Sequence, residues 1–204
     1  MTIYIVVITC VVSLLALQNH DIMNRLIFNS VAVSERGEWW RFITSGFVHG
    51  GFIHLAFNMI ALYSFGVAVE MYYDEVFITG SVYKFLILYF GGMVVAMLPS
   101  YKEHKHDPGY NSLGASGAVS AVVFACILFA PLQPIYLYGV IHLPGVIMGI
   151  AFLAVSYYAS KQGRGNINHS AHLWGALFGI AYTLALKPQI YNHFIKEISN
   201  ALNG

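Results

Sequence analysis

Uncharged polar residues inside apolar stretches are the groups of this sequence best suited to chemistry. Ser116 lies in Gly114-Ala115-Ser116-Gly117, at the expected start of a helix, where backbone N–H groups have no acceptor within the helix. Such donors can stabilise an oxyanion that forms at a carbonyl under attack. The structural alternative is a serine that caps the helix in a close-packing site, and the motif alone does not separate the two.

His172 is the residue that could act as a base for Ser116. It shares one helical face with Gly175 and Gly179, three and seven residues further along. Glycines allow membrane helices to pack closely, and such packing would bring His172 against a neighbouring helix. The structural alternative is a glycine packing face with a histidine at its edge. His169 lies nearer the helix end, where we expect it to be exposed or to cap the helix.

His54 and Asn58 could add side-chain donors to the same site. They are four residues apart, so they share a face of the helix expected over residues 52–71. Imidazole and amide donors directed into a dry cavity suit an oxyanion hole, whereas hydrogen bonds between membrane helices are the structural alternative. For His49, near the start of that helix, we expect a structural role.

The positions of the acidic residues limit the possible mechanisms. Asp21, Asp74 and Asp107 all fall in expected loops, and neither the helix of Ser116 nor that of His172 contains a carboxylate. If these two residues react together, they form a dyad and not the three-residue arrangement of soluble serine proteases. The metalloprotease motif His-Glu-x-x-His is absent, and the histidines lack the tight spacing of zinc ligands. We therefore expect no metal and no cofactor.

The composition indicates an integral membrane protein. Of the 204 residues, 58% are hydrophobic and 9% are charged, whereas a soluble domain carries roughly 25% charged residues. The net charge of +1 gives no reason to expect a nucleic-acid partner. Cys10 and Cys126 lie in apolar runs, and we expect both to be unpaired hydrophobic residues. The partner that the composition does imply is the lipid bilayer.

Apolar stretches divide the chain into six expected membrane helices. They cover approximately residues 2–17, 52–71, 83–98, 115–130, 135–159 and 169–186, so residues 1–204 are expected to form one all-α polytopic domain. The fourth stretch spans about 24 Å, which is less than the roughly 30 Å of the hydrocarbon core, and this places Ser116 below the membrane surface. Pro144-Gly145 predicts a kink in the fifth helix. Residues 189–202 predict an amphipathic helix at the membrane interface.

Three further residues are expected to support the second helix. Trp40 and Arg41 lie in the long segment between the first two helices, where tryptophan acts as an interfacial anchor. Glu70 lies near the opposite end of the second helix and provides an acidic partner there.

Taken in their order along the chain, these motifs resemble those of the rhomboid family of intramembrane serine proteases. The resemblance extends from about Trp39 to Leu186. It rests on Trp40-Arg41, on His49-x4-His54-x3-Asn58, on Gly114-Ala115-Ser116-Gly117 and on Ala171-His172-x2-Gly175-x3-Gly179. It implies a six-helix bundle around a water-filled cavity, with the segment between the first two helices partly in the membrane. The fifth helix and the loop over residues 161–168 would gate substrate access.

The resemblance also implies roles for the site residues. Ser116 would be the nucleophile and His172 the general base and then the acid, while His54, Asn58 and the Ser116 N–H would form the oxyanion hole. The reaction would be peptide hydrolysis through an acyl-enzyme, without metal or cofactor. The substrates would be transmembrane segments of other proteins, with a locally unstable helix and small residues near the cut.

Two features of the chain depart from the resemblance. Many family members place an aromatic residue one turn after the nucleophile, where it stacks on the catalytic histidine, but this sequence has Ser120 there. The stack is then lost, or a hydrogen bond replaces it. The basic residues gather in the first, third and fifth loops, which by charge alone would face the cytoplasm, whereas the resemblance implies that they face outside. We follow the resemblance, because ten basic residues are a small sample.

The alternative function is that of a rhomboid-like protein that binds membrane clients without cutting them, although such relatives usually lack the serine or the histidine. A channel or transporter fits less well, because the polar residues suit one compact site better than a pathway. The short chain favours a bacterial cytoplasmic membrane as the location.

Overall fold

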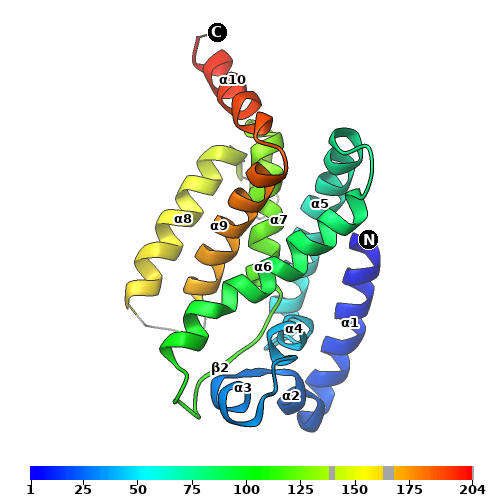
Figure 1. The fold of residues 1–204 in the computed structure, drawn as a ribbon, viewed down its shortest axis with the longest axis vertical. Helices are drawn as coiled ribbons and strands as arrows, with labels where there is room; N and C mark the ends of the chain where they lie inside the picture. Colours follow the sequence, from blue (N-terminus) through cyan, green and yellow to red (C-terminus); the bar gives the residue numbers. More distant parts are fainter. Residues whose placement is uncertain (138–140, 163–167, 204) are drawn as a thin grey trace.

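Six helices form a bundle, and one of the six lies at its centre, in the computed structural model, which describes residues 1–137, 141–162 and 168–203. They are α1 (Thr2–Gln18), α5 (Phe52–Val76), α6 (Ser81–Glu103), α7 (Ser116–Phe129), α8 (Gly145–Gln162) and α9 (His169–Leu186). Helix α7 packs against α5, α6, α8 and α9 (Figure 1), and nearly all of its residues are buried. The predicted all-α polytopic fold is confirmed.

The surface of the bundle is apolar and part of its interior is polar. Helices α5 and α6 are long and apolar enough to cross a membrane, while the apolar helices α1 and α7 are shorter. Helix α1 buries Thr2, Thr9 and Ser13, whereas Ile8 and Leu15 on its other face are about half exposed. This distribution is the reverse of that in a soluble protein, and it suits a surface that is covered by lipid.

The central helix is too short to span a bilayer by itself. Helix α7 has 14 residues, which corresponds to about 21 Å, against a hydrocarbon core of roughly 30 Å. Ser116 is its first residue. The nucleophile candidate therefore begins a helix that is shorter than the hydrocarbon core, and its place below the membrane surface stays a prediction.

The long segment between α1 and α5 is folded. It contains α2 (His20–Leu26), β1 (Phe28–Asn29), α3 (Ser30–Arg36), α4 (Arg41–Thr44) and a 3-10 turn over Ser45–Phe47. Strand β1 pairs antiparallel with β2 (Asn111–Ser112), with Phe28 opposite Ser112. The Asn29 side chain caps α3 by accepting from the N–H of Ala32. The pairing of the two strands ties this segment to the chain that leads into α7.

The expected fifth helix over residues 135–159 is wrong in its first part. Strands β3 (Pro134–Leu137) and β4 (Ile141–Pro144) form an antiparallel pair there, with Pro134 opposite Pro144, and α8 begins only at Gly145. Pro144 has no N–H to donate within a helix and disfavours helical geometry in the residue before it. The predicted kink at Pro144-Gly145 is therefore the start of the helix. The connection at residues 138–140 lies outside the described residues.

Other helix ends differ from the expected ones by a few residues. Helix α6 continues through Pro99, which the sequence predicts as its end, to Glu103. Its last turn is held by tertiary packing, because Ser100 is buried and Tyr101 packs edge-on against Phe42. Helix α8 continues to Gln162, into the predicted 161–168 loop, of which residues 163–167 lie outside the described residues.

Helix α10 (Gln189–Asn203) follows the bundle at the end opposite to α2 and α3 (Figure 1). Only Ile190 in it is buried. A helix over residues 189–202 was predicted, and its place at the membrane interface stays a prediction. Cys10 and Cys126 are both free, as expected.

Candidate active site

Helices α7 and α9 pack backbone to backbone beside the predicted nucleophile. A Cβ atom on Gly175 would overlap the carbonyl oxygen of Gly117, and the same overlap with α7 backbone would occur one turn later at Gly179. Only glycine lets the backbones of the two helices approach each other this closely. Because His172 precedes Gly175 by one turn and Ser116 precedes Gly117 by one residue, the close packing brings the two side chains together.

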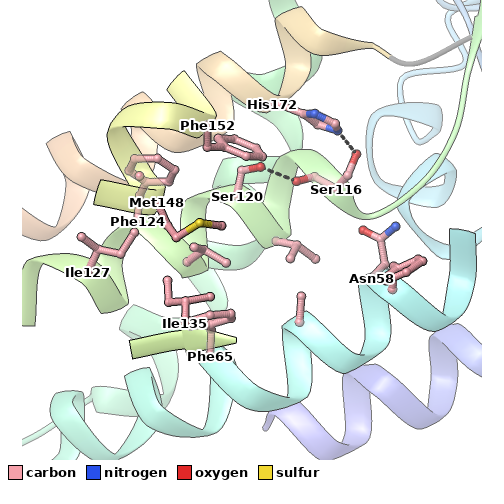
Figure 2. A pocket seen from close by; sticks show the side chains of 15 residues that line it. Asn58, Phe65, Ser116, Ser120, Phe124, Ile127, Ile135, Met148, Phe152 and His172 are labelled. Carbon is pink, nitrogen blue, oxygen red and sulfur yellow. Dashed lines mark hydrogen bonds between the residues drawn. The ribbon is translucent and has the colours of Figure 1, made fainter. Parts of the chain in front are cut away.

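Ser116 and His172 form a hydrogen-bonded pair. The distance between His172 Nε2 and Ser116 Oγ is 2.8 Å, and a dashed line marks this hydrogen bond in Figure 2. This is within the range of a nucleophile and its base. For Nε2 to accept the hydroxyl proton, the neutral imidazole carries its own proton on Nδ1. Within residues 1–137, 141–162 and 168–203, no carboxylate hydrogen-bonds to His172.

A cavity of about 260 Å³ opens beside this pair, between α5 and α8. Ser116, His172 and Asn58 line one end of it, and the rest of the wall is mostly apolar (Figure 2). The Asn58 side chain is buried, and its Nδ2 donates to the carbonyl oxygen of His54 at 2.9 Å. Because an amide nitrogen carries two N–H groups, a second donor remains for an oxygen atom in the cavity.

Gly114 allows the chain to pass close to His54 just before α7. Its φ angle is 108°, which favours glycine, and a Cβ there would lie 2.7 Å from His54 Cε1. The neighbouring His49 is fully buried, and its Nε2 accepts from the N–H of Ala115 at 3.3 Å. Its Nδ1 therefore carries the proton and donates to Ser13 Oγ at 3.3 Å. His49 thus connects α1 to the start of α7.

The three remaining predicted support residues lie away from the cavity. The Arg41 side chain is buried and donates to the carbonyl oxygen of Asn24 at 2.8 Å, near the end of α2. Trp40 beside it is exposed. Glu70, near the other end of α5, accepts from the backbone N–H of Thr2 at 3.1 Å. The Arg41 bond braces the long segment internally, joining α4 to α2, and the Glu70 bond holds the start of α1 against α5.

Asn168 is a residue of this region that the sequence analysis missed. It is the N-cap of α9, and its Oδ1 accepts from the N–H of Ala171 at 3.0 Å. Its Nδ2 donates to Tyr110 Oη at 2.9 Å and to Ser100 Oγ at 3.0 Å. Burial raises the pKa of Tyr110, so the phenol stays protonated. An asparagine before a helix is a signal for a cap, but its tertiary partners leave no signal in the sequence.

The structure places an aromatic ring on His172 from an unexpected helix. Ser120, where an aromatic residue is usual, donates from Oγ to the Ser116 carbonyl oxygen at 2.8 Å. The ring that stacks on His172 belongs to Phe152 of α8, with centroids 5.8 Å apart. The sequence analysis did not single out Phe152, because nothing in the apolar pattern of that helix distinguishes it.

A second histidine, His169, lies beside His172. The ring of His169 lies edge-on to that of His172, with centroids 5.8 Å apart. Among the described residues, no group of three or more His, Cys, Asp or Glu side chains is placed to hold a metal ion.

Comparison with known proteins gives a consistent set of relatives. A family model described as "Rhomboid domain" matches residues 36–189. The chain is 33% identical over 143 residues to the putative rhomboid protease YdcA of Bacillus subtilis (strain 168), covering 70% of this chain and 65% of that protein. It is 32% identical over 167 residues to the rhomboid protease GluP of the same organism, covering 82% and 30%. It is 30% identical over 168 residues to the mitochondrial RHOMBOID-like protein 12 of Arabidopsis thaliana, covering 78% and 49%. The matches span less than two thirds of the length of each of these relatives.

Proposed function

Because this chain belongs to the rhomboid family, we propose that it is a serine endopeptidase that cuts the transmembrane segments of other membrane proteins. The observation that carries the proposal is the 2.8 Å hydrogen bond between Ser116 Oγ and His172 Nε2 at one end of an apolar cavity. A reactive pair that opens onto an apolar cavity suits substrates that lie in the bilayer. Relatives named as rhomboid proteases support the same class of activity.

The first half of the reaction forms an acyl-enzyme. His172 Nε2 takes the hydroxyl proton as Ser116 Oγ attacks the scissile carbonyl carbon. The C–N bond then breaks, and the imidazolium gives that proton to the leaving amine. The developing oxyanion is stabilised by the Ser116 N–H at the start of α7 and by donors from Asn58 and His54. Asn58 lines the cavity with the dyad, and His54 lies against Gly114.

The second half returns the enzyme to its starting state. A water molecule attacks the acyl carbon and passes a proton to His172 Nε2, the bond from the carbonyl to Ser116 Oγ breaks, and the proton returns to the serine. No described carboxylate is bonded to His172, so the pair works as a dyad. His49, Arg41, Trp40 and Glu70 act as support, together with the glycines at positions 114, 117, 175 and 179.

The test is cleavage of a labelled transmembrane substrate by the protein in liposomes. We expect Ser116→Ala and His172→Ala each to lower turnover by at least roughly 1,000-fold, because neither the nucleophile nor its base can be replaced by water. His106→Ala is the matched control, because His106 is exposed in the loop after α6. Cleavage that survives either dyad change would contradict the proposal. Binding of the segment without cleavage by the wild type would favour a non-proteolytic client-binding protein.

We also propose that the protein resides in a bacterial cytoplasmic membrane, with the loops after α1 and α6 facing outside. The relatives named above include both bacterial and mitochondrial proteins, so family membership alone does not select the compartment. A cysteine introduced at residue 106 should react with a membrane-impermeant maleimide added outside intact cells. Labelling only after the cells are opened would reverse the orientation.

A further inference from the structure

We propose that Phe152 positions the imidazole of His172, so that the Ser116–His172 pair is correctly formed only while α8 lies against α7 and α9. The inference rests on the proposed function and concerns how the dyad is held. Phe152 is a positioning residue, because it acts through His172 and not on the reacting atoms.

The ring of Phe152 packs against that of His172. The Phe152 and His172 rings are inclined by 29° with centroids 5.8 Å apart, which is a stacked geometry. On its other side the Phe152 ring lies 5.8 Å from that of Phe124 of α7, tilted by 48°. One ring from α8 is therefore held between α7 and α9. Figure 2 shows it in the space between Ser120 and His172.

His172 needs such a contact to fix the orientation of its imidazole. In a Ser-His-Asp triad, a carboxylate bonded to Nδ1 fixes the plane of the imidazole. Among the described residues no carboxylate is bonded to His172, and its bond to Ser116 fixes only the Nε2 end. A stacked ring restricts the remaining rotation of the imidazole. Phe152 thus supplies by packing the orientation that a third catalytic residue supplies elsewhere.

Helix α7 itself does not supply the stacking ring. Ser120, one turn after Ser116, directs its hydroxyl to the Ser116 carbonyl oxygen. A small side chain here leaves room beside His172, and Phe152 fills it from α8. The ring at position 152 thus takes the place of the ring that position 120 lacks.

Helix α8 is less firmly attached to the bundle than α9 is. Its buried residues are Gly145, Gly149 and Ser156. A Cβ on Gly149 would lie 3.2 Å from Ile127 Cδ1 and 3.3 Å from Phe124 Cε1, which are side-chain atoms able to shift. Phe152 follows Gly149 by three residues, so it is on the same face. Outward movement of α8, which would widen the cavity between α5 and α8, takes the ring away from His172.

The test uses Phe152→Leu, which removes the aromatic face but keeps an apolar side chain of similar size. In the resting protein, the carbon-bound proton signals of labelled His172 should shift downfield, because the ring current of Phe152 is lost. In the liposome assay, kcat should fall about 10- to 100-fold with little change in KM. Tyr158→Leu is the matched control, because it removes an exposed aromatic ring from the same helix.

Two further variants separate positioning from a general packing defect. Phe152→Tyr keeps the stacked ring and should retain the wild-type kcat and histidine signals. Ser120→Phe combined with Phe152→Leu places a ring one turn after Ser116 and should recover part of the lost kcat. Unchanged histidine signals and kcat in Phe152→Leu would overturn the proposal. A rise in KM without a fall in kcat would also overturn it, because that result marks a substrate contact.

The inference and the proposed function fail in different ways. A wild type that never cleaves the substrate, and whose Ser116 does not react with a fluorophosphonate, contradicts the proposed function. The histidine signals of the same resting protein still report on Phe152, and their shift in Phe152→Leu shows without any turnover that its ring lies against His172, which the positioning role requires.

Discussion

Two of the glycine-mediated contacts of helix α7, those with α9 and with α8, differ in what the glycine meets. On the α9 side, Gly175 and Gly179 lie against α7 backbone, which has no freedom to move aside. On the α8 side, Gly149 lies against the side chains of Ile127 and Phe124, which can change rotamer. The residues of the dyad lie next to the contact between α7 and α9. The contact between α7 and α8 forms one wall of the cavity. The difference teaches that the proposed dyad lies beside rigid backbone packing, whereas α8, which borders the cavity, is held by side chains that can adjust.

The largest expected effect is that of Gly175→Ala, which tests the rigid contact. Its added methyl group would overlap the Gly117 carbonyl, so α9 has to move away from α7. We expect the free energy of unfolding to fall by about 3 kcal/mol and substrate cleavage to be lost. Denaturation in detergent micelles, together with the liposome assay, measures both. A wild-type midpoint in this variant would show that the contact is not rigid.

A smaller loss is expected from Asn168→Ala, at the end of the same contact. The change removes the cap of α9 and the donors to Tyr110 and Ser100. We expect a loss of about 1–2 kcal/mol of stability and a lower kcat, because the first turn of α9 carries His172. Asn168→Ser keeps a capping oxygen but lacks the amide donors, so its midpoint should lie between those of Ala and wild type. Equal midpoints for Ser and Ala would assign the whole effect to the amide donors.

Gly149→Ala makes the same chemical change at the adaptable contact and is the direct counterpart of Gly175→Ala. Because the added methyl group meets only side-chain atoms at 3.2 and 3.3 Å, we expect a loss of less than about 1 kcal/mol. The kcat should fall modestly, since α8 and Phe152 shift together. A destabilisation as large as that of Gly175→Ala would remove the distinction between the two contacts.

The smallest expected effect is that of Ser120→Ala. The Ser120 hydroxyl bonds back to the Ser116 carbonyl oxygen, which the helix already satisfies through its own N–H donor. We expect a change within about 0.5 kcal/mol and near-wild-type cleavage. A large loss of kcat in this variant would show that Ser120, and not Phe152, controls the dyad.

The pair of Ser116 and His172, beside the rigid contact of α7 with α9, could be predicted from the sequence. The glycine spacing after His172 and the helix start at Ser116 are local patterns, and close packing of two such faces leaves few arrangements. Phe152 could not be predicted in this way. It is one of many apolar residues in its helix, and which of them faces His172 depends on where α8 lies relative to α9.

The same limit explains why parts of the fold could not be predicted correctly from the sequence. The apolar run from Ile135 to Pro144 contains β-branched and aromatic residues, and periodicity does not separate a strand from a helix in so short a run. The strand pair β1–β2 joins residues far apart in the chain through two-residue strands, which are too short to produce an alternating pattern. The partners of Asn168 likewise come from α6 and from the loop before α7.

The buried hydroxyls of α1 have a consequence for biogenesis. When α1 first leaves the ribosome and enters lipid, Thr2, Thr9 and Ser13 face hydrocarbon, because the helix that later covers them has not been made. A Cβ on Gly66 of α5 would lie 2.6 Å from Thr2 Oγ1, so α5 is shaped to receive this face closely. Until α5 is synthesised, these hydroxyls lack the cover that the folded bundle gives them. Because the α2–α4 segment lies between α1 and α5 in the chain, the two helices can come together only after this segment has been made.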